Sequence, residues 1–148
     1  MEDKRIVLLV EDNPDDEALT LRALKKNNIL NDVVVARDGS EALDCLLGSA
    51  GKPPRIRLEQ LAVVLLDLKL PKVNGLEVLR RLRADPRTKL VPIVILTSSK
   101  EEKDLVGAYD SGANSYVQKP VEFADFVRAA GHLGLYWLVT NASPPMPG

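Results

Sequence analysis

Polar residues that could carry out chemistry follow four short apolar runs of the sequence. They are Glu11 and Asp12 after residues 6–10, Asp67 after residues 61–66, Thr97 after residues 93–96 and Lys119 after residues 115–118. If these runs are parallel strands of one sheet, their carboxyl ends lie at the same edge, where ligands collect in such sheets. The sequence therefore predicts that three carboxylates, a hydroxyl and a lysine meet at one rim.

Three carboxylates that lie close together repel one another, and each raises the pKa of its neighbours unless a cation relieves the repulsion. Mg²⁺ suits such a set because it prefers oxygen ligands and binds one or two carboxylates together with a phosphate. A carboxylate at this rim can attack a phosphoryl group and form an acyl phosphate. The metal and the lysine would offset the charge on the phosphoryl oxygens, so the set predicts Mg²⁺-dependent phosphoryl transfer.

Five short apolar runs predict the strands that position these residues. The runs are 6–10, 33–36, 61–66, 93–96 and the weaker 115–118. They are rich in β-branched residues and do not alternate between apolar and polar positions. This pattern is typical of strands that are buried on both faces of a parallel sheet.

Segments with helical apolar spacing lie between and after these runs and predict five helices. They are 15–28, 40–47, 74–84, 100–111 and 122–138. Alternating strands and helices specify an α/β architecture with right-handed crossovers. The predicted fold is a flavodoxin-like (βα)5 doubly wound sandwich around a five-stranded parallel sheet. Residues 48–60 form the one long irregular connection, which is either a plain surface insertion or a loop that contacts a partner.

The composition is that of a globular domain and argues against several classes of function. The chain has 148 residues, and we expect one domain over residues 1–140 followed by a disordered tail over 141–148. A net charge of −1 and an aromatic content of 4% argue against nucleic-acid binding. Cys45 and His132 are the only cysteine and histidine, so there is no internal disulfide and no multi-histidine metal site. No apolar run is long enough to cross a membrane, and we expect a cytoplasmic protein.

Four segments of the sequence resemble the receiver domain of bacterial two-component response regulators. They are Val-Glu-Asp at 10–12, Leu-Asp-Leu-Lys-Leu-Pro-Lys-Val-Asn-Gly at 66–75, Thr-Ser-Ser at 97–99 and Gly-Ala-Asn-Ser-Tyr-Val-Gln-Lys-Pro at 112–120. Their order and spacing match, and the resemblance covers residues 5–138. The insertion before the third strand and the segments 82–88 and 135–138 are similar, more narrowly, to the single-domain regulators associated with cyanobacterial and bacterial phytochromes.

The resemblance implies a role for each matching residue at the predicted rim. Asp67 would accept a phosphoryl group from a sensor histidine kinase. Asp12 would bind Mg²⁺ together with Asp67, Glu11 would help directly or through water, and the backbone carbonyl of Lys69 would be the third protein ligand. Many receivers carry a polar residue such as Asn two positions after the acceptor. Lys69 departs from that pattern, which leaves the lifetime of the phosphorylated state unspecified.

The same resemblance implies a switch between two states. Thr97 and Lys119 would bind the phosphoryl oxygens after transfer, and Tyr116 would turn inward when Thr97 moves. Such a protein is a phosphoacceptor that catalyses only its own phosphorylation and dephosphorylation, and is not an enzyme acting on other substrates. We expect its output to be contact with a downstream protein or phosphorelay partner.

The end of the last predicted helix indicates a further contact. Residues 135–139, which include Tyr136 and Trp137, are apolar on every side, and one packed face cannot bury them all. We therefore expect a homodimer through this helix, with the fifth strand and fourth helix nearby. The alternative is that this end folds back onto its own domain.

Several simpler interpretations stand beside these predictions. Asp15 and Asp16 fit a solvated first helical turn in which acidic residues favour the helix dipole. Arg80, Arg81 and Arg83 fit a solvated helix face, and Cys45 fits a core position. At the level of function, the alternative is a pseudo-receiver that binds partners without phosphorylation. An aspartyl-phosphate phosphatase would need a second Asp where Lys69 stands, and a flavodoxin-like electron carrier would not place acidic residues after its first strand.

Overall fold

The computed structural model describes residues 6–26, 32–97, 107–108, 110–119, 124–125 and 128, and centres on one sheet. Its strands are β1 (Ile6–Val10), β2 (Asp32–Ala36), β3 (Leu61–Asp67), β4 (Ile93–Thr97) and β5 (Ser115–Gln118). All pairs are parallel, and the spatial order is β2-β1-β3-β4-β5. The predicted flavodoxin-like five-stranded sheet is therefore confirmed, and the strand bounds differ from the predicted ones by one residue at most.

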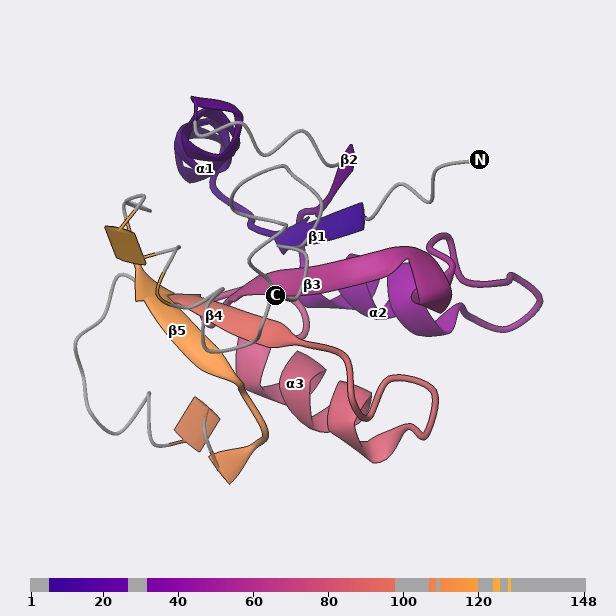
Figure 1. Ribbon diagram of the computed structural model, residues 1–148. Helices are drawn as coiled ribbons and strands as arrows, with labels where there is room; N and C mark the ends of the chain where they lie inside the picture. The colour runs from indigo at the N-terminus through magenta and orange to yellow at the C-terminus, as the bar shows by residue number, and fades with distance from the viewer. Residues whose placement is uncertain are drawn as a thin grey trace, which may run out of the picture.

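Helices cover both faces of this sheet. Helix α1 (Pro14–Lys26) lies on one side, whereas α2 (Gly39–Leu47) and α3 (Gly75–Ala84) lie on the other (Figure 1). This placement follows from right-handed crossovers on either side of the point where the strand order reverses. The predicted helices at 100–111 and 122–138, and the predicted tail at 141–148, lie largely or wholly outside the described residues.

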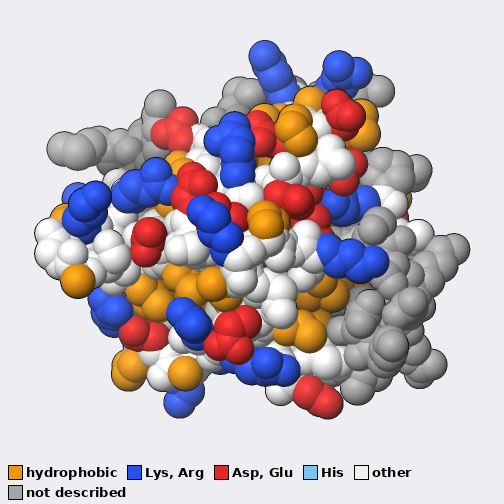
Figure 2. All heavy atoms as spheres, turned by 180° about the vertical axis from the view of Figure 1, so that it is seen from behind, with side chains coloured by type: hydrophobic (Ala, Val, Ile, Leu, Met, Phe, Trp, Pro, Cys, Tyr) orange, Lys and Arg blue, Asp and Glu red, His pale blue; other side chains and the backbone are white. Residues whose placement is uncertain are grey.

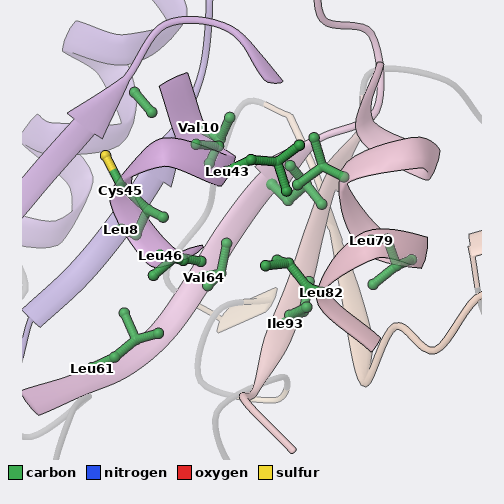
Figure 3. Close-up of a cluster of buried hydrophobic side chains, with 14 of the residues drawn as sticks. Leu8, Val10, Leu43, Cys45, Leu46, Leu61, Val64, Leu79, Leu82 and Ile93 are labelled. Atoms are coloured by element: carbon green, nitrogen blue, oxygen red, sulfur yellow. The ribbon is translucent and has the colours of Figure 1, made fainter. Parts of the chain in front are cut away.

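The two faces of the central strands contribute to two separate cores. Leu8, Val10, Val64, Leu66 and Ile93 pack with side chains of α2 and α3, and several of these contacts are visible in Figure 3. The intervening residues, such as Val7 and Leu9, point to the other face of the sheet and pack with Leu24 of α1 in the second core. Because successive strand residues point to opposite faces, a strand that is buried on both sides needs an unbroken apolar run.

The edge strands differ from that prediction. The burial of β5 alternates, with Ser115 and Val117 buried and Tyr116 and Gln118 exposed, and β2 is only partly buried. The central strands β3 and β4 are buried at every position. An edge strand has a neighbour on one side only, so its run need not be apolar throughout.

Side-chain caps fix the helix starts that lead away from the rim. Asn13 Oδ1 accepts the backbone N–H groups of Asp15 and Asp16 at 2.8 and 3.1 Å. Asp38 Oδ1 accepts that of Glu41 at 2.7 Å at the start of α2, and Asn74 caps α3. Such caps satisfy amide groups that have no partner within the helix. The start signals at Asn13-Pro14 and Asp38-Gly39 are therefore confirmed.

The connection over residues 48–60 is partly ordered around the core. It contains a short 3₁₀ helix, η1 (Leu58–Gln60), and Ile56 is 2% exposed. The Ile56 N–H donates to the carbonyl of Cys45, and Cys45 is fully buried, as predicted. Part of this connection is therefore packed against α2 and is not only a surface insertion.

Arg83 corrects the prediction of a solvated arginine face on α3. Its guanidinium donates to the backbone carbonyls of Thr88, Lys89, Val91 and Gly112 and to Asn114 Oδ1, at 2.7 to 3.3 Å. Arg80 and Arg81 are exposed and pair with Glu77, as expected for a solvated face. Helical periodicity alone does not distinguish Arg83 from Arg80 and Arg81, because the partners of Arg83 lie in loops that come later in the chain.

The charges on one face of the molecule are mixed. On the face in Figure 2, the coloured acidic and basic side chains are interspersed and no single-sign patch stands out among them. In the part of the chain that the structure describes, no helix has the length and apolar character that crossing a membrane requires.

Candidate functional site

Three carboxylates meet at the carboxyl ends of neighbouring strands. Glu11 and Asp12 follow β1, Asp67 ends β3, and oxygens of all three lie within 4.8 Å of one another. Glu11 is fully buried and Asp67 is 6% exposed, whereas Asp12 is exposed. The parallel pairing of β1 with β3, which places Val10 beside Leu66, brings these residues together as the sequence predicts.

Lys119 follows β5 and reaches across the sheet edge to this cluster. Its Nζ donates to Glu11 Oε1 at 2.8 Å, to Asp67 Oδ2 at 2.8 Å and to Asp16 Oδ2 at 2.9 Å. The Lys119 side chain is only 9% exposed. An ammonium group has three N–H donors, so these three carboxylates use all of them.

The third of these contacts corrects the interpretation of Asp16 as a solvated residue of the first turn. The contact joins α1 to the end of β5, and its two residues are 103 positions apart in the chain. Asp15, its neighbour, is exposed, as predicted. The only sequence signal that separates the two is that Asp16 follows Asp12 by four residues, which is about one helical turn.

The site carries more negative than positive charge. The carboxylates of Glu11, Asp16 and Asp67 pair with one ammonium group, and a fourth carboxylate, that of Asp12, lies within 4.8 Å of Glu11 and Asp67. Burial, helped by a hydrogen bond with Asp67, raises the pKa of Glu11 to about 7, against the opposing effect of Lys119. Burial alone would lower the pKa of Lys119, but its bonds to Asp67, Glu11 and Asp16 together raise it above its usual value.

This donor set fits a hard divalent cation. The three clustered groups offer only oxygen atoms, and two of them are held in place by Lys119. A bound cation would offset the repulsion among these carboxylates. The residues present can therefore hold a metal ion, as the sequence predicts.

The segment after β3 fixes the orientation of Asp67. The backbone N–H of Lys69 donates to Asp67 Oδ1 at 2.9 Å, while Lys119 holds Oδ2. Gly75 starts α3 directly behind this turn, and a Cβ at that position would lie 2.4 Å from the Asp67 carbonyl oxygen. Only glycine permits this close approach. The Asn74-Gly75 pair therefore begins α3 and also holds the turn that carries Asp67.

Thr97 lies on β4, the strand next to that of Asp67, and Tyr116 lies on β5, one strand further out. Thr97 ends β4 and is 3% exposed, and the register pairs Leu96, its neighbour, with Asp67. The Thr97 carbonyl accepts the backbone N–H of Lys119 at 2.8 Å. Tyr116 pairs with Ile95 and is 45% exposed. Tyr136 and Trp137, the predicted dimer residues, lie outside the described residues.

An open hollow of about 460 Å³ lies beside the cluster. Asp12, Lys69 and Asn74 form its polar part, and its apolar part is formed by Leu68, Leu70, Pro71 and Leu76. The exposed side of the acidic cluster is thus open to a molecule that approaches from solvent. The buried side, at Glu11, is closed.

Comparisons with known proteins agree with this geometry. The family model described as "Response regulator receiver domain" matches residues 7–130. The probable methanogenesis regulatory protein FilR2 of Methanothrix harundinacea is 40% identical over 97% of this chain and 90% of its own length. Response regulator Rcp1 of Synechocystis is 34% identical over 95% and 93%.

Solved structures give the same result. The bacteriophytochrome response regulator AtBRR is 52% identical, with a TM-score of 0.76 over 90% of this chain and 94% of its own. The Mn²⁺-bound form of Rcp1 is 30% identical, with a TM-score of 0.70 over 95% and 99%. With the family match, these likenesses imply a histidine kinase as partner. The chain belongs to the response regulator receiver family and is homologous to the single-domain response regulators of phytochromes.

Proposed function

We propose that this chain is a phosphorylation-controlled switch in which Asp67 accepts a phosphoryl group from the phosphohistidine of a sensor histidine kinase. The cofactor of this chain in the reaction is Mg²⁺. The observation that carries the proposal is the orientation of Asp67, whose two oxygens are held by the Lys69 N–H and the Lys119 ammonium beside an open hollow. The similarity to phytochrome response regulators supports a phytochrome as the kinase. We also propose a cytoplasmic location, which suits phosphorylation by a kinase.

The reaction is a nucleophilic displacement at phosphorus. A carboxylate oxygen of Asp67 forms the new P–O bond while the P–N bond to the donor imidazole breaks, and the bonding electron pair stays on the imidazole nitrogen. Lys119 lies within hydrogen-bond distance of Asp67 and can therefore donate to a phosphoryl oxygen as charge develops there. Its raised pKa keeps it protonated throughout. The product is an acyl phosphate on Asp67.

The carboxylates of Glu11, Asp12 and Asp67 are the proposed Mg²⁺ ligands, with the backbone carbonyl of Lys69 as a further ligand. When bound, the ion supplies charge that offsets the negative phosphoryl oxygens. The oxygen-only donor set supports Mg²⁺, and the existence of a Mn²⁺-bound form of the similar protein Rcp1 supports a divalent ion as cofactor. Lys69 also presents its side chain near the hollow, where it can affect the rate of self-catalysed dephosphorylation.

Thr97 and Tyr116 are the proposed switch. The new group brings a charge of about −1.5 to −2 to the rim. The Thr97 hydroxyl would donate to a phosphoryl oxygen, and Tyr116, exposed on the neighbouring strand, would turn inward. To invert a 99:1 equilibrium, phosphorylation must favour the second state by about 5.5 kcal/mol. Charge-assisted hydrogen bonds from Thr97 and Lys119 are of the kind that can provide much of this difference.

The remaining parts of the proposal concern the chain as a unit. We propose that residues 1–140 form the receiver domain and that 141–148 are a tail. We also propose that the protein forms a homodimer through the helix that carries Tyr136 and Trp137, and that its output is contact with a downstream protein or a phosphorelay partner. The exposed Tyr116 on the edge strand β5 supports an interaction surface at this edge of the sheet.

The test is labelling by radioactive acetyl phosphate, which supplies a phosphoryl group without a partner protein. We expect Mg²⁺-dependent, acid-stable and base-labile incorporation in the unmodified protein and none in Asp67→Asn. Asp44→Asn, at an exposed position on α2, is the matched control and should label normally. Labelling that persists in Asp67→Asn would refute the acceptor assignment, and no labelling of the unmodified protein would favour a pseudo-receiver.

A further inference from the structure

Asp16 differs from the other two carboxylates that hold Lys119. Glu11 and Asp67 extend from the strands and belong to the group of three acids whose oxygens lie within 4.8 Å of one another. Asp16 comes from the first turn of α1 and is not a member of that group, although its Oδ2 lies 2.9 Å from Lys119 Nζ. Lys119 therefore has two anchors inside the reacting cluster and one outside it.

The three hydrogen bonds that Lys119 donates to these carboxylates would not stay equally strong during phosphoryl transfer. When an Asp67 oxygen forms a bond to phosphorus, the carboxylate loses its charge and becomes a weaker hydrogen-bond acceptor. Glu11 is one of the proposed metal ligands, so the cation competes for its electron density. Asp16 takes part in neither event and remains a full carboxylate.

The placement of Asp16 is itself fixed by the backbone. Its N–H donates to Asn13 Oδ1, the cap of α1, which positions the first turn of the helix over the rim. The Asp16 side chain is 35% exposed while that of Lys119 is 9% exposed, so Asp16 approaches Lys119 from the solvent side. A short ion pair to a nearly buried ammonium restricts the movement of that ammonium.

We propose that Asp16 is a positioning residue, which holds Lys119 Nζ in place while the phosphoryl group is transferred to Asp67. This inference rests on the proposed function. It requires that Asp16 speeds the reaction, although it adds a fourth negative charge to a site that must admit a phosphoryl donor. If Asp16 acted only through its charge, its removal would lower the repulsion of the donor and the reaction would become faster. The two roles therefore predict opposite changes in rate.

The experiment measures the rate of labelling by acetyl phosphate at saturating Mg²⁺, over a range of acetyl phosphate concentrations. Asp16→Ala should lower the maximal rate by about tenfold, which is typical of the loss of a group that orients another. The concentration for half-maximal rate should change little, because the substrate does not contact Asp16. Asp16→Asn keeps an acceptor oxygen in the same place and should recover most of the rate.

Asp15→Ala is the matched control. It removes the same charge from the same helical turn at an exposed position, and should label at the rate of the unmodified protein. Thermal unfolding of each variant shows whether it is folded, and Asp16→Asn provides the comparison if Asp16→Ala is not. Three results would overturn the inference: Asp16→Ala as fast as the unmodified protein or faster, Asp15→Ala equally slow, or Asp16→Asn as slow as Asp16→Ala. If the unmodified protein itself is not labelled, the proposed function fails instead.

Discussion

The carboxylates of the rim differ in what balances their charge. Glu11 and Asp67 each accept a hydrogen bond from Lys119, whereas Asp12 lies within 4.8 Å of both and is exposed. Two like charges at such a distance repel by a few kcal/mol at the effective dielectric constant of a protein surface, and less where water screens them. We therefore expect Asp12 to cost stability when no cation is bound and to bind the cation when one is present.

This reasoning predicts that Asp12→Asn has opposite effects with and without metal. In EDTA the free energy of unfolding of the variant should be higher than that of the unmodified protein by on the order of 1 kcal/mol, because one repelling charge is gone. The variant should therefore unfold at a higher temperature. Mg²⁺ should stabilise the unmodified protein by about 2.7 kcal/mol at one hundred times its Kd, and should stabilise Asp12→Asn far less. Thermal unfolding in EDTA and in a Mg²⁺ series measures both effects.

Asp44→Asn is the control for this prediction because Asp44 is exposed on α2 and is not among the clustered acids. It should change neither the stability in EDTA nor the gain from Mg²⁺. The explanation would be wrong if Asp12→Asn lost stability in EDTA, or if Mg²⁺ stabilised it as much as it stabilises the unmodified protein.

At the scale of elements, Arg83 joins α3 to the segments that enter β4 and β5. Its guanidinium bonds to the carbonyls of Val91 and Gly112 and to Asn114 Oδ1, and that same oxygen accepts the backbone N–H of Ile93. Arg83 thereby ties the amino ends of β4 and β5 to one helix. The carboxyl ends of the same two strands lead to Thr97 and Lys119. A planar guanidinium can bond to several segments because its five N–H donors are spread over three nitrogens, whereas a lysine ammonium has three donors on a single nitrogen.

Replacement of Arg83 should therefore lower stability much more than replacement of its neighbour. We expect Arg83→Met, which keeps the apolar stem, to lower the free energy of unfolding by about 2–4 kcal/mol, because several partly buried carbonyls lose their donors together. Arg83→Lys should recover less than half of this loss. Arg80→Met, at an exposed position of the same helix, should stay within about 0.5 kcal/mol. Urea unfolding measures the three values, and equal losses at positions 80 and 83 would contradict the explanation.

The strands and the residues at their carboxyl ends are the parts of the structure that the sequence predicts best. The apolar runs predict the strands closely because a strand buried on both faces, such as β3, leaves no polar position to obscure its limits. The rim residues Glu11, Asp12, Asp67 and Lys119 are predicted to meet because parallel strands end at one edge. Local patterns carry this information.

Arg83 and Asp16 are misread for a common reason. Each fits a solvated helix by its local spacing, and each finds its partners in segments that are distant in the chain. Asp16 meets Lys119 across 103 positions, and Arg83 meets Asn114 across 31. These contacts depend on how far each helix is rotated and translated on the sheet. Helical periodicity does not specify that placement to the accuracy of a hydrogen bond.

At the scale of the whole molecule, the position of β5 at the sheet edge bears on how a signal leaves the domain. Lys119, directly after β5, contacts Asp67, the proposed phosphoacceptor, and Tyr116 on the same strand is 45% exposed. One short strand therefore links the proposed chemistry to the surface. A shift of this strand after phosphorylation would change what that surface presents to a partner.

The apolar segment near the end of the chain leads to a prediction about the oligomeric state. Residues 135–139 are apolar on every side, and Trp137 among them is the only tryptophan of the chain. If a second copy buries this segment, light scattering after size exclusion should give about twice the chain mass of 16.2 kDa. Trp137→Glu should give the monomer, because a buried carboxylate without a partner opposes association, whereas Trp137→Phe should remain a dimer. A monomeric unmodified protein, or a Trp137→Glu dimer as tight as the original, would show that this segment packs against its own domain instead.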